Sequence, residues 1–348
     1  MEGIKKSLTK KIPNGKLLRI DLTSREGHIS EISLTGDFFL HPEECIVDIE
    51  KALTGKSIDV KKAEIQDIIE NVLGKKQAQL MGVSPRDIAE QVREILDKKH
   101  RFRLLPMQVF DAATNMALDE AIEEAVREGE SLPTIRIYTW KPDAISIGYF
   151  QGLENEVNLK KCKEQGVDIV RRRTGGGAVY HSEEGEITYS IIAPQKLFPA
   201  NIIASYKEIC MPLVEALELV GVKAEFSPIN DISANGKKIS GNAQTRRDDI
   251  LLQHGTLLYS VDVDTMFSLL TVSKEKIADK FIASVKKRVT SLSDENPKVG
   301  KEEFIEKLIE CYKKRFEIEL GEYSEKEVQR AKELVAQRYS QQSWTAMR

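Results

Sequence analysis

The chain has 348 residues, a formal net charge of −3 and four cysteines. Its length predicts about two domains of ~150 residues each, and its charge balance argues against a general nucleic-acid-binding surface. The cysteines form no Cys-x-x-Cys pair and have no histidine cluster nearby, which argues against structural zinc and a disulfide framework. No segment approaches the ~18 apolar residues of a membrane span, and Pro13 and Asn14 stand where a secretory signal needs an apolar run. We therefore expect a soluble, cytoplasmic protein whose cysteines are reduced and buried.

The first hundred residues predict a small α+β unit. Residues 16–36 alternate between apolar and polar side chains around a polar turn at 24–27, as a β-hairpin does. A helix is expected between Pro42 and Gly55, and a second one after Ser84, which is a good N-cap residue. Charged and polar residues follow from 97 to 103. We place the domain boundary there, which gives a small domain at 1–103 and a larger domain at 104–348.

The larger domain predicts helices interleaved with short strands. A helix is expected over 111–128, strands over 135–140, 145–150, 167–171 and 187–193, and a further helix over 206–219 that Pro212 should kink or split. Asn235-Gly236 lies between two strand-like halves of 229–243 and predicts a tight hairpin. This order of elements indicates an α/β (α+β) fold on a mixed sheet.

The segment from Arg171 to His181 reads Arg-Arg-Arg-Thr-Gly-Gly-Gly-Ala-Val-Tyr-His and resembles an anion-binding loop. Glycines let several backbone N–H groups approach one ligand, and neighbouring arginines can balance its charge. The pattern is neither a Walker loop nor the dinucleotide fingerprint, because no Gly-Lys-Ser/Thr follows and the glycines are contiguous. A phosphate or phosphate ester would fit this loop, and a plain structural turn is the alternative.

A second group of candidates surrounds Lys238, which follows the predicted hairpin turn. Alternation along a strand points Lys237 and Lys238 to opposite faces, so one of them can reach a site, although a surface lysine pair is the simpler interpretation. His181 and His254 could act as general bases, but hydrogen-bonded structural histidines are more common. Asn230-Asp231 could supply an oxygen ligand to Mg²⁺ or simply cap a turn.

These motifs, taken in order, resemble those of lipoate-protein ligases. The resemblance rests on the glycine segment, on Asn230-Asp231, on Gly-Lys-Lys-Ile-Ser-Gly-Asn-Ala-Gln at 236–244 and on Gln-His-Gly-Thr-Leu-Leu at 253–258. It extends to 115–120, 284–292 and 343–345, and so covers 104–348. Residues 16–73, with Gly-Asp-Phe-Phe at 36–39, also resemble the accessory domain of that family. In many bacterial ligases this domain follows the catalytic one, whereas here it comes first.

The resemblance implies a catalytic domain similar to those of biotin ligases and class II aminoacyl-tRNA synthetases. It also implies a two-step reaction in which lipoate and ATP, with Mg²⁺, give lipoyl-AMP, and a lysine of an acceptor then takes the lipoyl group. Acceptors would be lipoyl-domain proteins of 2-oxoacid dehydrogenases or the glycine cleavage system. No dedicated metal cage is expected. The N-terminal domain is suggested to act as a lid over the adenylation site.

Individual site residues follow from the same resemblance. Lys238 would stabilise charge at the lipoate carboxyl and the α-phosphate instead of acting as a nucleophile, because a lysine-bound acyl group is an unreactive amide. Residues matched to ATP or lipoyl-AMP contacts are Arg172, Arg173, Gly175, Gly176, Gly177, Ala178, Val179, Tyr180 and His181. Residues that could support the site or link to Mg²⁺ are Asn230, Asp231, Ser240, Gly241 and His254.

Our leading prediction from the sequence is therefore an ATP-dependent lipoate-protein ligase. One alternative is a cysteine-dependent octanoyl or lipoyl transferase, in which a thiol carries the acyl group. We disfavour it because Ile229-Asn230-Asp231 stand where one transferase group has its cysteine, and Cys210 lies in a predicted helix. The other alternative is a non-catalytic subunit that binds lipoate or a nucleotide. The sequence leaves open the acceptor, the oligomeric state and the choice between lipoate and octanoate.

Overall fold

The computed structural model describes residues 4–25, 27–97, 99–260, 262–271 and 288–348. These residues form two units by their internal contacts. One comprises Met1–Lys99 with Lys196–Ala204, and the other comprises His100–Gln195 with Ser205–Arg348. Among the helices in these ranges, none has both the length and the apolar character needed to cross a membrane.

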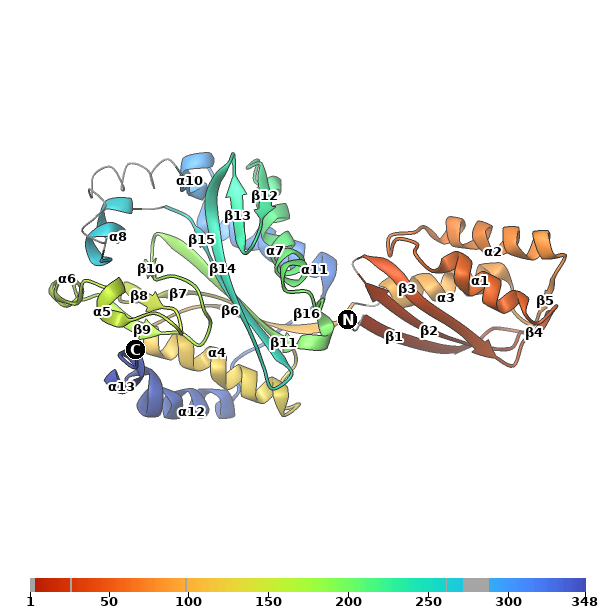
Figure 1. The fold of residues 1–348 in the computed structure, drawn as a ribbon, viewed down its shortest axis with the longest axis horizontal. Helices are drawn as coiled ribbons and strands as arrows, with labels where there is room; N and C mark the ends of the chain where they lie inside the picture. The colour runs from red at the N-terminus through yellow and green to blue at the C-terminus, as the bar shows by residue number, and fades with distance from the viewer. Residues whose placement is uncertain (1–3, 26, 98, 261, 272–287) are drawn as a thin grey trace. The chain divides into compact units, whose positions relative to one another are not determined.

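The N-terminal unit is a small sheet with helices on one face (Figure 1). The strands β1 (Ile4–Lys11), β2 (Leu17–Arg25) and β3 (His28–Gly36) are antiparallel, and the register Leu18↔Gly36 to Arg25↔His28 confirms the predicted hairpin. Its core lies between this sheet and the helices α1 (Cys45–Leu53), α2 (Lys62–Lys76) and α3 (Pro85–Asp97). The hydroxyl of Ser84 accepts the Asp87 N–H at 3.2 Å, which caps α3 as predicted. A short pair, β4 (Phe39–His41) with β5 (Gln79–Met81), completes the unit.

The second unit is built on a large mixed sheet. In the described part of the chain this sheet has eight strands in the order β12-β13-β14-β15-β11-β7-β6-β16. The pairs β6–β7 and β6–β16 are parallel and the other pairs are antiparallel, which confirms the predicted α/β (α+β) class on a mixed sheet. The bounds are β6 (Arg101–Phe110), β7 (Thr134–Trp140), β11 (Glu186–Pro194), β12 (Ala224–Ser227), β13 (Asp231–Ala234), β14 (Lys237–Arg247), β15 (Ile250–Leu258) and β16 (Glu317–Leu320).

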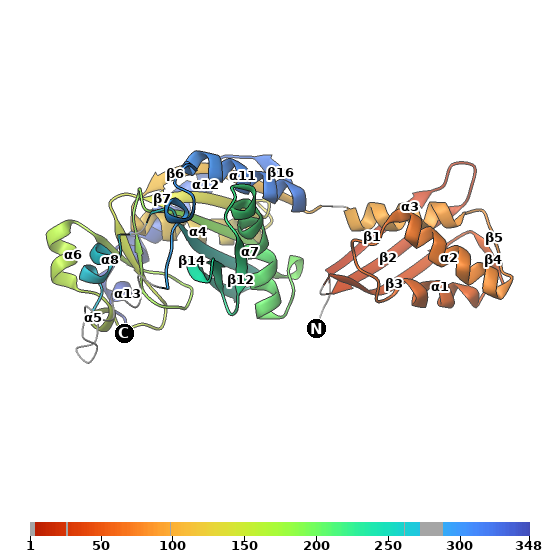
Figure 2. The ribbon, with the colours of Figure 1, turned by 90° about the horizontal axis from the view of Figure 1, so that it is seen from above.

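Helices cover both faces of this sheet (Figures 1 and 2). The helix α4 (Ala112–Arg127) packs on one face, where its Asp119 contacts Ser190 and His254, and α12 (Glu325–Leu334) lies beside α4. The helix α7 (Ile202–Leu219) packs on the other face, where Cys210 meets Tyr189. An ion pair joins it to α11 (Lys301–Arg315). Successive residues of β11 thus face opposite helices, as alternation along a strand requires. The sequence predicted a kink or a split at Pro212, and the split is wrong, because α7 continues through the proline.

The remaining elements are shorter. A second sheet has the order β10-β8-β9, with β8 (Ala144–Ile147), β9 (Asp168–Arg171) and β10 (Val179–His181). The turn between β9 and β10 carries the three glycines. The remaining helices are α5 (Leu153–Glu156), α6 (Leu159–Gln165), α8 (Val263–Leu269), α10 (Leu292–Glu295) and α13 (Gln342–Thr345), with single turns η1 (Gln195–Leu197) and η2 (Val335–Tyr339).

Candidate active site

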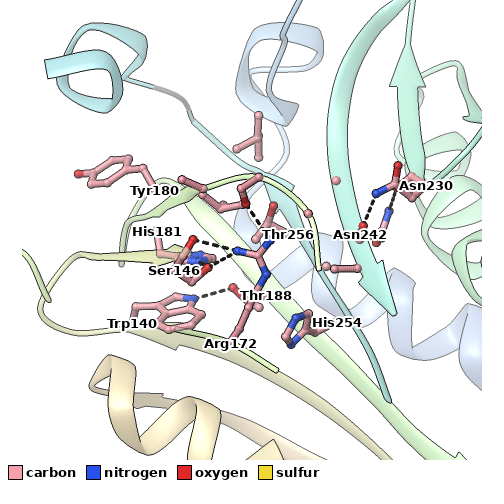
Figure 3. Close-up of a pocket in the computed structure, with 18 of the residues that line it drawn as sticks. Trp140, Ser146, Arg172, Tyr180, His181, Thr188, Asn230, Asn242, His254 and Thr256 are labelled. Carbon is pink, nitrogen blue, oxygen red and sulfur yellow. Dashed lines mark hydrogen bonds between the residues drawn. The ribbon is translucent and has the colours of Figure 1, made fainter. Parts of the chain in front are cut away.

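A pocket of about 280 Å³ lies in the second unit, where the large sheet meets the glycine segment. Its apolar wall includes Met116 on α4, Trp140 on β7 and Met266 on α8, together with Leu258 and Val289. Polar side chains come from β8, β11, β14 and β15 and from residues next to β9 and β13, and Figure 3 shows several of them facing the cavity. An apolar cavity with a few polar groups is typical of a small-molecule site. The polar lining residues include Ser146, Arg172, Thr188, Asn230, Lys238, Asn242, His254 and Thr256.

The side chain of Arg172 holds the glycine segment in shape. Its guanidinium is buried and donates to the carbonyl oxygens of Ser146 at 2.9 Å, Gly175 at 2.8 Å and Gly177 at 2.7 Å. Burial lowers its pKa from 12.5 to about 10, which still leaves it charged near neutral pH. Gly176 has a φ of +97°, and a Cβ there would stand 2.9 Å from the Arg172 guanidinium. Most donors of Arg172 are therefore committed to the loop itself.

The other two arginines of the triplet do not line the pocket among the described residues. Arg171 donates to the carbonyls of Gly148, Gln151 and Thr345 and so ties the loop after β8 to the C-terminal segment. Arg173 forms an ion pair of 2.9 Å with Glu123 on α4. Gly176 to His181 line the pocket, whereas Gly175 does not and packs near Phe150. The contacts predicted for Arg173 and Gly175 thus remain predictions that the pocket lining does not support.

Lys238, on β14, lines the same pocket. The turn at Asn235 and Gly236 has positive φ at both residues, 48° and 77°, which confirms the predicted hairpin. The Lys238 ammonium lies 2.8 Å from the Asp231 carboxylate, and 45% of its side-chain surface is exposed. A Cβ at Gly241 would come within 2.9 Å of this ammonium, so the glycine gives the lysine room. Lys238 and the glycine segment therefore face one cavity.

The other residues suggested near Lys238 differ in their positions. Asn230 and Gly241 line the pocket, whereas Asp231 and Ser240 do not. The Asn230 amide donates to the Asn242 carbonyl, and the Asn242 amide returns a bond of 2.8 Å to the Asn230 carbonyl. Asn230 thus fastens the start of β13 to β14. In the described chain, no group of three or more His, Cys, Asp and Glu side chains is arranged to hold a metal ion.

Both histidines line the pocket, and both have their ring nitrogens occupied. His181 lies 2.7 Å from the Ser146 hydroxyl and 2.7 Å from the Glu186 carboxylate, and its ring stacks on Trp140. His254 lies 2.7 Å from the Thr174 hydroxyl and 3.2 Å from Asp119, and burial lowers its pKa. Such contacts are those of hydrogen-bonded structural histidines. These hydrogen bonds hold the glycine segment and the neighbouring pocket lining in position.

The four cysteines are free and buried, and none is among the described residues that line the pocket. Cys210 comes nearest by contacts, because Tyr189 lies between it and Asn242. Burial raises the pKa of the Cys210 thiol to about 12, so it stays protonated at neutral pH.

Part of the pocket lining was not predicted from the sequence. Tyr138 and Trp140 on β7, Thr188 on β11 and Thr256 on β15 were not proposed for the site, although all four line it. Thr256 lies in the family motif at 253–258, whereas the other three carried only the alternation of strands, which does not tell which face covers a cavity. Of the predicted family motif at 284–292, residues 284–287 lie outside the described residues, and Val289 lines the pocket.

Comparison with known proteins places this fold and site in the class of lipoyl ligase and transferase catalytic domains. Residues 111–313 match the model of the lipoyl protein ligase A/B catalytic domain, and residues 4–91 match that of the bacterial lipoate protein ligase C-terminus. The chain therefore belongs to the lipoyl protein ligase A/B family, as the sequence predicted. The C-terminal domain of the bacterial ligases stands at the N-terminus here.

Individual relatives carry two kinds of name. The octanoyltransferase LipM of Brevibacillus brevis is 33% identical over 71% of this chain and 99% of its own length, and that of Clostridioides difficile is 33% identical over 68% and 95%. Among solved structures, a bipartite lipoate protein ligase of Thermoplasma acidophilum, described with its E2 lipoyl domain, has a TM-score of 0.65, 31% identity and coverage of 72% and 98%. A lipoate-protein ligase A bound with ATP has a TM-score of 0.61, 30% identity and coverage of 72% and 99%.

The octanoyltransferase relatives contradict our prediction of an ATP-dependent ligase. They are named as transferases, and this favours the alternative of a cysteine-dependent octanoyl or lipoyl transferase over the ligase. Their names do not state whether a cysteine carries the acyl group. The physical reason for the error is that a glycine segment and a lysine can hold an acyl carbonyl in either reaction. These motifs indicate that an acyl group is bound, but they do not indicate how that group is activated.

Proposed function

We propose that this protein transfers an octanoyl or closely related acyl group from an activated donor to a lysine of a lipoyl-type acceptor domain. The observation that carries the proposal is that Lys238 and the glycine segment line one largely apolar pocket. An apolar cavity suits a saturated acyl chain, and a cation at its rim suits the acyl carbonyl. The names of the octanoyltransferase relatives support the same reaction. The division at residues 103 and 104 into accessory and catalytic domains is part of this proposal.

The chemistry that the site supports is acyl transfer from a thioester to an amine. The neutral ε-amine of the acceptor lysine attacks the thioester carbonyl, so that a C–N bond forms and the C–S bond breaks. The departing thiolate takes the proton that the amine loses, and an amide and a thiol result. Negative charge develops on the carbonyl oxygen during the attack. The Lys238 ammonium and the N–H groups of the glycine segment are the donors available to stabilise it.

The proposed transfer is direct and needs no cysteine acyl-enzyme. A thiol that carries an acyl group must reach the donor carbonyl and must ionise readily. The buried cysteines satisfy neither condition, and Cys210 has a pKa of about 12. Lys238 itself acts as an electrostatic group, because an acyl group on its amine would be a stable amide.

The test uses the full chain, an octanoyl thioester and an apo lipoyl domain, without nucleotide. Mass spectrometry should show one octanoyl group on the acceptor lysine. Lys238→Met should reduce the rate by about 10² to 10³, the usual cost of losing one such donor. Lys237→Met is the matched control, because Lys237 precedes it on β14 and does not line the pocket among the described residues; its rate should stay close to that of the unaltered protein.

Two results would overturn the proposal. Product that forms only from free octanoate or lipoate with ATP would show that the enzyme activates its own substrate. If no product forms from any donor, the protein binds a ligand but does not catalyse transfer.

A further inference from the structure

An aromatic–arginine patch lies beside the loop after β8 and consists of Tyr149, Phe150, Arg247 and Arg348, none of which lines the pocket. Phe150 is 71% exposed, although its side chain is large and apolar. Its ring meets the Tyr149 ring edge-on, with 5.1 Å between their centres. The Arg348 guanidinium lies 5.5 Å from the centre of the Phe150 ring. Aromatic rings and arginines are the residues that dominate binding energy at protein–protein interfaces.

The two guanidinium groups of the patch carry charge that the described chain does not neutralise. Neither Arg247 nor Arg348 forms an ion pair with an acidic side chain among the described residues. Arg173, close by, differs because it pairs with Glu123 at 2.9 Å. Both guanidinium groups of the patch face the Tyr149 ring, at 5.1 and 5.8 Å from its centre. Two like charges held at one ring repel each other, and an anion bound beside them would offset this repulsion.

The patch adjoins the pocket along the glycine segment. The Tyr149 N–H donates to the Thr174 carbonyl at 2.8 Å, and a Cβ at Gly175 would lie 3.8 Å from the Phe150 ring. The next two glycines line the pocket. A protein that brings a lysine side chain into this pocket must also cover the surface beside it, because a stable contact between two proteins takes about 800 Å² from each partner. Such a protein would therefore contact the patch.

We propose that the aromatic–arginine patch docks the acceptor domain through carboxylate side chains near its target lysine. This inference rests on the proposed function, because it takes a protein lysine as the acyl acceptor. Guanidinium groups bind carboxylates through paired hydrogen bonds, and the exposed Phe150 ring offers apolar contact beside them. Arg247 and Arg348 select acceptors with acidic residues around the lysine and take no part in the chemistry.

The experiment measures transfer from a saturating octanoyl thioester to an apo lipoyl domain and to a short lysine peptide without acidic residues. In a protein with both Arg247→Gln and Arg348→Gln, the KM for the domain should rise about threefold to thirtyfold, the range expected for two exposed ion pairs. The kcat for the domain and the rate with the peptide should not change. The matched control carries Arg25→Gln and Arg86→Gln, because these exposed arginines of the N-terminal unit alter the net charge equally.

A second variant, Phe150→Ala, tests the apolar part of the patch. Its KM for the domain should rise about tenfold, as for an aromatic residue that anchors an interface, and its kcat should not change. Phe39→Ala is the matched control, because Phe39 is 58% exposed and has the Lys16 ammonium 5.5 Å from its ring centre, but it belongs to the N-terminal unit.

Two outcomes would overturn the proposal. The first is a KM for the domain that is equal in the double variant and in its arginine control. The second is a KM that rises for the thioester donor and not for the domain, which would show that the patch binds an anionic part of the donor.

Calorimetric binding of the apo lipoyl domain separates this inference from the proposed function. If the unaltered protein transfers no acyl group but binds the domain more tightly than the double variant does, the result supports the patch and overturns the proposed transfer. If transfer occurs and both proteins bind the domain equally, the proposed function stands and the role of the patch is wrong.

Discussion

The two basic clusters of the site differ in how they use their charges. Arg172 in the triplet is buried and gives its donors to backbone carbonyls, and Arg173 is paired with Glu123. Lys238 keeps 45% of its side-chain surface exposed, and its ion pair within the described residues is with Asp231. The arginines thus build the cavity and the lysine is free to meet a ligand. A basic motif in a sequence can be structural or can face a ligand, and the burial of its side chains distinguishes the two roles.

The largest effect should come from Lys238→Met, which removes the exposed cation. We expect a loss of about 2.7–4 kcal/mol of transition-state stabilisation, or roughly 10² to 10³ in rate. Because the pair with Asp231 is partly exposed, the free energy of unfolding should change by less than about 1 kcal/mol. Single-turnover transfer and chemical denaturation measure the two quantities. A large loss of stability would place Lys238 with the structural arginines.

Arg172→Met should show the opposite pattern. Removing the guanidinium leaves the carbonyls of Gly175 and Gly177 without their buried donor, at a cost of roughly 3 kcal/mol in stability. Hydrogen exchange of the amides in the glycine segment should accelerate, while those of the N-terminal unit should not change. Unaltered exchange in this segment would contradict the structural role.

The burial of Glu123 predicts a pH dependence of stability. Burial raises the pKa of Glu123 from 4.5 to about 7, despite the opposing charge of Arg173. The folded protein therefore holds a proton that the unfolded chain releases above about pH 4.5. This contribution to stability is present below that pH and is lost as the pH rises toward 7.

Glu123→Gln removes this titration. Between about pH 4.5 and 7.5, the unaltered protein should lose up to about 3 kcal/mol more stability than the variant. Denaturation curves at several pH values measure the difference. Parallel curves for the two proteins would show that Glu123 is not held in its protonated form.

The smallest effect concerns the turn that places Lys238. Gly236 has a φ of 77°, which alanine adopts only at a cost of about 1 kcal/mol. Gly236→Ala should lower stability by this amount and shift Lys238 enough to reduce transfer. Gly74→Ala in α2 is a control, because a Cβ there meets nothing within 4 Å and its φ is not positive. Equal transfer by the two variants would mean that the turn does not set the position of Lys238.

The sequence predicted elements whose signals are local. The Asn235-Gly236 turn, the cap at Ser84 and the helix that begins after Asp111 all depend on neighbouring residues, and all are present. The helix expected over 206–219 is present as α7, but its continuity through Pro212 was not predicted, because packing of its buried residues on the sheet overrides the cost of the proline.

The residues of the site were also predictable only in part, because only some of them carry a local signal. The glycine segment and Lys238 carry distinctive residue types, whereas Trp140 and Thr188 belong to the pocket through the pairing of distant strands. The activation step was not predictable from the motifs, since an acyl carbonyl makes the same demands in a ligase and in a transferase.

The most direct test of the account is to look for an acyl-enzyme. The full chain is mixed with an octanoyl thioester and an apo lipoyl domain, quenched in acid at successive times and measured by intact mass spectrometry. We predict that the octanoyl group moves from the donor to the acceptor lysine and is never found on the enzyme. An octanoyl group on a cysteine of the enzyme that appears before the product and decays as product forms would contradict direct transfer at Lys238.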